Sequence, residues 1–175
     1  MGRLDAVTLP IADLDGFVLA ADVTAAEDVP PFANTAVDGY AVRSSDVKHP
    51  PVDLLVVGEL AAGAAPTHEV MPGTAVRIMT GAPMPAGADA VVMVEETERL
   101  DGGTRVRVKS SVGPGDAVRS AGSDVGSGVR VFAAGTVLNG PSLGVLASIN
   151  RNEVSVVRRA RVAVISTGDE LVTDG

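Results

Sequence analysis

Asp38 is the acid with the most unusual sequence surroundings in this chain. It lies in the stretch from Pro31 to Val42, PFANTAVDGYAV, among small and apolar residues. An acid in such surroundings is partly desolvated, which raises its pKa unless a cation or a hydrogen-bond donor compensates. The stretch therefore predicts a functional acid. A plain turn is an equally good interpretation, since Asp-Gly is a common turn dipeptide.

Two further stretches have residues that could position an anion. In VRIMTGAPMPA, residues 76–86, Thr80 offers a hydroxyl and Gly81 a free amide on a loop stiffened by proline, which suits a phosphate or an oxyanion. In RSAGSD, residues 119–124, Arg119 can fork onto such an anion, and Asp124 closes the stretch. Each has a simpler interpretation: Thr80 as a local cap at a strand end, and Arg119 with Asp124 as a surface ion pair.

The last apolar run of the sequence is followed by two acids. Residues 162–165 predict a buried strand, and Asp169 and Glu170 come after it, where open α/β sheets bind ligands. Such a strand needs later strands and helices to cover both faces. We therefore expect the front part of a larger enzyme, cut as its ligand-binding domain begins, with residues 161–175 poorly ordered or borrowed by a neighbour.

Composition and charge narrow the possible functions. The 175 residues include 14 basic and 22 acidic side chains, a net charge of −8, which argues against bulk affinity for nucleic acid or anionic membranes. A local basic patch could still hold a small anion. Without cysteine and with only two histidines, a zinc site is not expected. No leader and no apolar run of about 18 residues is found, so the expected compartment is the cytoplasm.

The elements that must position these residues are mostly short strands. The apolar residues are mainly Ala and Val, which favours sheets, and frequent Gly and Pro supply the turns. Helical spacing predicts a short amphipathic helix over residues 8–19, and a proline at the first turn predicts another over 141–149. Further strands are predicted at residues 19–25, 52–60, 75–80, 90–97, 104–110, 129–132 and 154–157. The strands between 52 and 112 suggest a small barrel or coiled sheet inserted between two halves of a smaller α/β layer.

Four stretches, taken together and in this order, resemble one family. PFANTAVDGYAV, RIMTGAPMPAGADAVVMVEET, RSAGSDV and VISTGDEL closely resemble the molybdopterin molybdotransferases, which include bacterial MoeA and the homologous domain of gephyrin. The resemblance covers essentially the whole chain and implies a mainly β fold with some α. A coiled, barrel-like β domain, residues 33–119, would be inserted into a discontinuous small α/β domain, residues 8–32 and 120–158. The truncated start of a MogA-like molybdopterin-binding domain would follow at 159–175.

The resemblance also implies an activity. Family members insert molybdenum, supplied as molybdate, into adenylylated molybdopterin and release AMP in a Mg²⁺-dependent step of molybdenum cofactor biosynthesis. Matched onto this sequence, the catalytic residues are Asp38, Thr80, Asp124 and Glu170, and Arg119 binds substrate, while the metal ligands stay open. Ser120 and Ala121 replace further cations of the family motif, which should weaken anion binding. A homodimer and a pterin substrate are implied, the molybdopterin adenylyltransferase is a further candidate partner, and no nucleic acid or membrane is expected.

Two functions from different classes remain in competition. In one, the chain is the N-terminal portion of the transferase and is inactive alone. In the other, it is a non-catalytic dimerisation or scaffold module, which requires only self-association. An unrelated small-molecule sensor on a β barrel is a third hypothesis, and it predicts ligand binding that is independent of molybdopterin. The sequence does not distinguish molybdate from tungstate.

Overall fold

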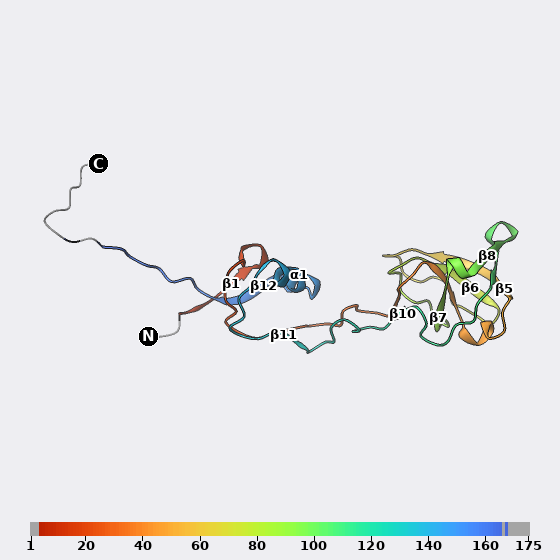
Figure 1. Ribbon diagram of the computed structural model, residues 1–175, viewed down its shortest axis with the longest axis horizontal. Coiled ribbons are helices and arrows are strands. Elements are labelled where there is room, and N and C mark those ends of the chain that lie inside the picture. Colours follow the sequence, from red (N-terminus) through yellow and green to blue (C-terminus); the bar gives the residue numbers. More distant parts are fainter. Residues whose placement is uncertain (1–3, 166, 168–175) are drawn as a thin grey trace. The chain divides into compact units, whose positions relative to one another are not determined.

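The structure, a computed structural model, describes residues 4–165 and 167. It divides into two compact units (Figure 1): unit 1 takes its residues from 1–24 and 130–175, and unit 2 is the continuous segment 25–129. Most regular elements are strands, so the expected mainly β fold with some α is confirmed. No helix in the described residues is both long enough and apolar enough to span a membrane.

Unit 1 contains two small antiparallel pairs of strands and one helix. β1 (Ala6–Pro10) pairs with β12 (Glu153–Val157), and β2 (Val23–Thr24) pairs with β11 (Arg130–Phe132). The 3-10 helix η1 (Ile11–Asp13) follows β1 directly. The helix α1 (Gly140–Ser148) begins after Asn139, whose side chain accepts a hydrogen bond from the Ser142 amide. This cap and the proline in the first turn explain why the helix begins where the sequence predicted.

The helix predicted over residues 8–19 is wrong. Residues 6–10 are strand β1, and only residues 11–13 turn, as η1. The β1 backbone pairs with β12 over five residues, and the apolar positions Leu14 and Leu19 are buried without a helix. Pairing with a distant strand has outweighed the local helical spacing. The strand predicted over 19–25 is reduced to β2 for the same reason, since residues 18–20 bond individually to Thr136, Val157 and Ser155.

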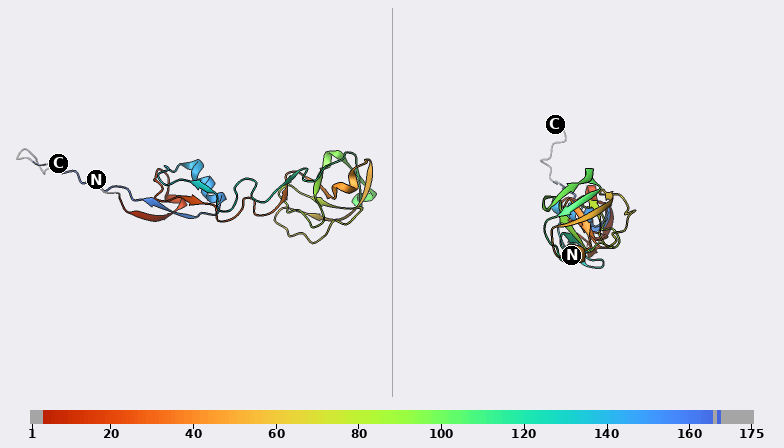
Figure 2. Two further views of the ribbon diagram at one scale, coloured as in Figure 1. Left: turned by 90° about the horizontal axis from the view of Figure 1, so that it is seen from below. Right: turned by 90° about the vertical axis from the view of Figure 1, so that its right-hand side faces the viewer.

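Unit 2 is a curled six-stranded sheet with the order β7-β4-β6-β5-β9-β8. Its strands are β4 (Gly39–Val42), β5 (Val52–Leu60), β6 (Thr74–Ile78), β7 (Ala90–Met93), β8 (Thr97–Leu100) and β9 (Arg105–Val108). β5 and β6 run parallel, whereas all other neighbours are antiparallel. Figures 1 and 2 show the sheet curling around its interior, where Tyr40, Leu54 and Val106 are buried in one cluster and Leu60 and Ile78 in another.

Short turns and two further strands complete unit 2. The 3-10 turns are η2 (Ser44–Val47), η3 (Val94–Glu96) and η4 (Asp101–Gly103). η3 splits the strand predicted over 90–97 into β7 and β8, and the Thr97 hydroxyl donates back to the Val94 carbonyl at the end of this turn. Outside the curled sheet, β3 (Asn34–Thr35) pairs with β10 (Val118–Arg119).

The two segments that enter and leave unit 2 bond to one another. The Ala25 amide donates to the Val129 carbonyl, and Val29 bridges Val125. The compact unit therefore includes residues 25–32 and 120–129, which the family domain boundaries at 32 and 119 would place outside it. Those family boundaries stay a prediction.

Residues 161–165 carry no strand in the structure. Val162, Val164 and Ile165 are 79 to 90% exposed, although the sequence predicted a buried strand there. A single strand has no neighbour to satisfy its backbone groups or to cover its apolar side chains. Asp169 and Glu170 lie outside the described residues.

Candidate functional site

Asp38 and Thr80 are in direct contact. The Thr80 backbone amide and the Thr80 hydroxyl both donate to Asp38 Oδ1, each at 2.7 Å. Asp38 immediately precedes β4 and Thr80 follows β6, and these strands are antiparallel neighbours with Gly39 opposite Ile78. Sheet pairing therefore joins two of the sequence stretches that had been considered separately.

The carboxyl of Asp38 is held in its ionised form. The Thr80 amide, the Thr80 hydroxyl and, more weakly, the charge of Arg77 lower the pKa of Asp38 below its ordinary value and outweigh a small desolvation effect. Desolvation alone would have raised the pKa of Asp38, and the two donors of Thr80 reverse this effect. Asp38 itself is exposed, which leaves the carboxylate accessible to a ligand.

Gly39 is not explained by a plain Asp-Gly turn. It is the first residue of β4, and its φ angle lies outside the left-handed region. A Cβ atom at this position would collide with the Val92 carbonyl oxygen of the neighbouring strand β7. Gly39 is therefore required by close strand packing, and this packing places Asp38 at the very start of β4.

Arg119 and Asp124 form an ion pair. Arg119 Nη2 lies 2.6 Å from Asp124 Oδ2, and the two side chains are 46 and 51% exposed. The surface ion pair considered in the sequence analysis is thus present. An exposed pair of this kind contributes little to stability. The pair engages Nη2 of Arg119, and the donors on its other guanidinium nitrogens could still contact an anion.

The short strand β3 connects the two pairs. Asn34 lies opposite Arg119 in the β3–β10 pairing. On the other side of β3, the Gly81 amide donates to the Thr35 carbonyl at 2.9 Å, and the Thr35 amide donates to Ala82. Thr80 and Arg119 are therefore carried by segments that bond to the same two residues.

Asn34 was missed by the sequence analysis. Its side chain is buried, and its Oδ1 atom has no hydrogen-bond partner among the described residues. A buried amide oxygen without a partner is costly, so this position is a polar group held beside Arg119 at a cost in stability. The available signal was an Asn in the middle of a stretch of small residues, which the focus on Asp38 overlooked.

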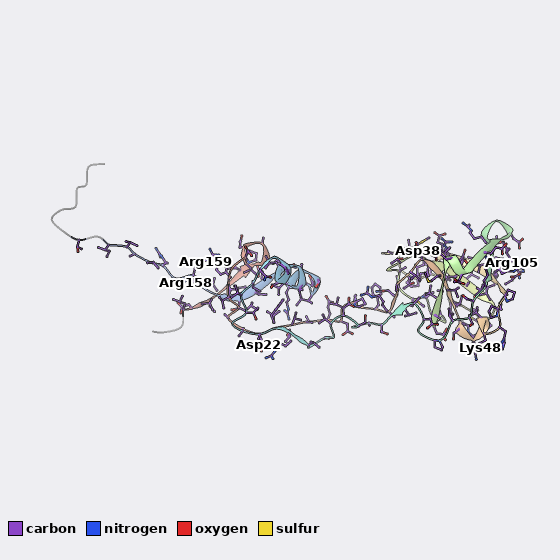
Figure 3. The ribbon with its side chains drawn as sticks, viewed as in Figure 1. Asp22, Asp38, Lys48, Arg105, Arg158 and Arg159 are labelled. Carbon is purple, nitrogen blue, oxygen red and sulfur yellow. The ribbon has the colours of Figure 1, made fainter. Side chains whose placement is uncertain are left out.

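A magnesium site is not complete in this part of the chain. The described residues bring no three His, Asp or Glu side chains together in a way that could hold a metal ion. Asp38 Oδ1 is occupied by Thr80, and Asp124 is paired with Arg119. Glu170, the remaining residue implied by the resemblance, lies outside the described residues. Asp38, marked in Figure 3, keeps its second carboxylate oxygen without a hydrogen bond among the described residues and is therefore a candidate ligand.

Comparisons with known proteins agree with one another. Residues 3–150 match the family described as MoeA N-terminal region (domain I and II). The chain is 42% identical to molybdopterin molybdenumtransferase 2 of Mycobacterium tuberculosis, over 97% of this chain and 42% of that protein. It is 43% identical to the molybdopterin molybdenumtransferase of a Nostoc species, over 91% of this chain and 37% of that protein. The chain thus spans less than half the length of these relatives.

A solved structure extends this likeness to three dimensions. The crystal structure of the molybdopterin biosynthesis moeA protein from Pyrococcus horikoshii matches with a TM-score of 0.83 at 35% identity, over 87% of this chain and 41% of that one. At this level of identity and coverage, the similarity extends across both compact units.

Proposed function

Because this chain belongs to the family of the MoeA N-terminal region (domain I and II), we propose that it supplies this region of a molybdopterin molybdenumtransferase. In the proposed reaction, molybdenum from molybdate enters the dithiolene of adenylylated molybdopterin, and AMP is released. The relatives that carry this name are 42 and 43% identical to the chain. As part of the same proposal, residues 33–119 form an inserted β domain of the family, and residues 8–32 with 120–158 form its small α/β domain.

One observation carries the proposal. The four described residues that the resemblance assigns to the site, Asp38, Thr80, Arg119 and Asp124, form two contacting pairs attached to strand β3. In the proposed site, Thr80 fixes the Asp38 carboxylate, which orients a water. Arg119, oriented by Asp124, binds the anionic part of the substrate.

Magnesium and Glu170 belong to the proposed activity of the whole protein. Mg²⁺ prefers carboxylate oxygens together with substrate phosphates and water, and Asp38 is the candidate ligand among the described residues. Since these residues do not complete a metal site, no step of the proposal depends on the ion. Glu170 keeps its proposed catalytic role by resemblance alone.

The oligomeric state and the cellular compartment are part of the same proposal. We propose a homodimer in the cytoplasm that binds a pterin and contacts the molybdopterin adenylyltransferase. Sedimentation of the chain at ~100 μM should show a dimer, since stable dimer interfaces persist well below this concentration. A monomer at that concentration would contradict the homodimer and leave the proposed activity to be tested separately.

A chimera tests the proposed activity. Residues 4–158 of this chain replace the matching residues of the Mycobacterium tuberculosis relative, and both molybdenum incorporation and AMP release are measured with adenylylated molybdopterin. We expect turnover by the chimera and its loss in Asp38→Asn, which keeps the shape of the side chain and removes its charge. The matched control Arg105→Gln, an exposed cation of β9, should retain activity.

Two outcomes would redirect the interpretation. Near wild-type turnover in the Asp38→Asn chimera would overturn the role of this acid. A folded, self-associating chimera without turnover would instead favour the scaffold module considered in the sequence analysis.

A further inference from the structure

A pocket of about 360 Å³ opens in unit 2, and none of the four residues of the candidate site is among its lining residues. It lies between strands β4, β5 and β6 and the turn that joins β8 to β9. Its lining includes two arginines, Arg77 and Arg99, together with Tyr40 and Glu59. The proposed function gives none of these side chains a contact with substrate, although the charge of Arg77 helps to lower the pKa of Asp38.

Arg77 presents a fixed guanidinium with unused donors. It lies opposite Tyr40 in the β4–β6 pairing, and its guanidinium carbon is 5.3 Å from the centre of the Tyr40 ring. Its Nη1 donates to the Tyr40 hydroxyl at 3.3 Å, while its buried Nε has no partner among the described residues. Stacking and one hydrogen bond therefore orient the group, and that bond engages only one of its five donors among the described residues.

Arg99 reaches the same pocket from β8. A Cβ atom at Gly103 would collide with Nη2 of Arg99. Gly103 also has a φ of 101°, which favours glycine. Gly103 thus permits both the backbone conformation of the turn and the position of the Arg99 guanidinium. In the described part of the chain, neither Arg99 nor Arg77 lies within ion-pair distance of an acid.

Three other arginines of the described residues have an acid partner that the two arginines of the pocket lack. Arg107, Arg119 and Arg130 each pair with an aspartate. The pocket contains a single acid, Glu59, which lies opposite Arg77 in the β5–β6 pairing but forms no ion pair with it. Two arginines against one exposed carboxylate give the lining a net positive charge, on a chain whose net charge is −8.

We propose that this pocket binds a small tetrahedral oxyanion of the phosphate class, held by the guanidinium donors of Arg77 and Arg99. Forked donors match the oxygen spacing of such anions. The Tyr40 hydroxyl fixes the orientation of Arg77, and the open mouth of the pocket admits an anion that is free or attached to a larger molecule. The inference does not depend on the proposed transferase activity.

The chain provides a probe for this site. Tyr40 is its only tyrosine, and tryptophan is absent, so a fluorotyrosine-labelled chain gives a single fluorine NMR signal from the pocket wall. Phosphate, sulfate, molybdate and AMP are titrated in turn at constant ionic strength, with chloride as the reference anion. We expect a saturable shift, and an affinity weakened about tenfold or more in Arg99→Gln, because a lost charged hydrogen bond contributes this much. Arg105→Gln, an exposed arginine of the adjacent strand β9, should bind as the unaltered chain does (Figure 3).

The outcomes show whether the bound anion is free or part of a nucleotide, and which results would overturn the proposal. Equal binding of the inorganic anions supports a site for free oxyanions, whereas tighter binding of AMP than of phosphate supports the phosphate of a nucleotide. Absence of a saturable shift up to ~50 mM of every anion, or equal losses in Arg99→Gln and Arg105→Gln, would overturn the proposal. Arg77→Gln is a second variant that should also weaken anion binding. If it unfolds the sheet, the affinity measured with Arg99→Gln still tests the proposal. The chimera assay is independent of these results.

Discussion

At the scale of single residues, Asp38 combines an exposed position with strong local hydrogen bonding. Its two bonds from Thr80 hold one carboxylate oxygen and leave the other without a hydrogen bond in the described part of the chain. The pKa of Asp38 is lowered chiefly by these bonds, with the charge of Arg77 adding to them. A carboxylate that stays ionised, is fixed in place and remains accessible is suited to orient water or a cation.

Asp38→Asn should preserve the fold and change the pH dependence of stability. Asn can still accept both Thr80 donors, so unit 2 should stay folded. In the unaltered chain the folded-state pKa lies below the ordinary 3.8. The carboxylate therefore stabilises the fold at pH values above the unfolded-state pKa, and this contribution is lost as the pH falls through the folded-state value. Below about pH 4, we expect the free energy of unfolding to fall less steeply in the variant.

Urea unfolding at several pH values between 7 and 3 measures this difference. Glu95→Gln, which alters an exposed acid of η3 that makes no side-chain hydrogen bond in the described residues, is the matched control. Equal acid sensitivity of Asp38→Asn and the unaltered chain would show that the Thr80 bonds do not favour the ionised form.

Arg119→Gln and Asp124→Asn should separate stability from function. Their ion pair is about half exposed, so each substitution should cost less than about 1 kcal/mol of unfolding free energy. In the chimera, loss of Arg119 should reduce turnover strongly, because the forked cation is then missing. Arg119→Lys keeps the charge but not the fork and should be intermediate. A large stability loss with unchanged turnover would assign the pair to structure alone.

At the scale of the elements, two glycines make a matched comparison. Gly39→Ala should destabilise unit 2 by about 1–3 kcal/mol, because the new methyl group meets the Val92 carbonyl of the paired strand β7. Gly144→Ala should stabilise unit 1 by about 0.5–1 kcal/mol, since this exposed position in α1 has open space around it. Hydrogen exchange resolved by residue would report each effect in its own unit. If Gly39→Ala left the stability of unit 2 unchanged, strands β4 and β7 would be able to move apart at no cost.

The sequence was sufficient for the elements that are specified locally. Strand β5 and helix α1 were found because an apolar run bounded by Gly and Pro, and a proline at a first turn, each define an element without help from distant residues. Residues 8–19 failed because β12, more than 130 positions away, determines their conformation. The same limit applies to the site. The stretches around Asp38 and Thr80 were visible in the sequence, but their contact, the buried Asn34 and the stacking of Arg77 on Tyr40 depend on the sheet register.

At the scale of the whole molecule, the chain leaves unit 1 and returns to it through paired residues. Thr24 lies opposite Arg130 within unit 1, and the Ala25 amide bonds to the Val129 carbonyl within unit 2. Each unit therefore has its two junction residues side by side, and each contains its own buried residues. These are the conditions under which an inserted domain folds independently.

Both units should fold after separation. Residues 25–129 alone should give a β-type circular dichroism spectrum and a cooperative thermal transition, because they retain the complete six-stranded sheet. Unit 1 should fold when residues 25–129 are replaced by Asn-Gly, since a two-residue hairpin turn can join Thr24 to Arg130 across their pairing. An unfolded 25–129 fragment would show that the sheet depends on the remainder of the chain.

The same connectivity fixes the response of the protein to tension. Ala6 and Val157 face each other at one end of the β1–β12 pairing, and the hydrogen bonds between antiparallel strands run perpendicular to them. Pulling at these two points therefore breaks the bonds one pair at a time, as in unzipping, and not all together in shear. No load reaches unit 2 until Thr24 and Arg130 have parted, so a molecule stretched from its ends opens unit 1 first while the curled sheet stays closed.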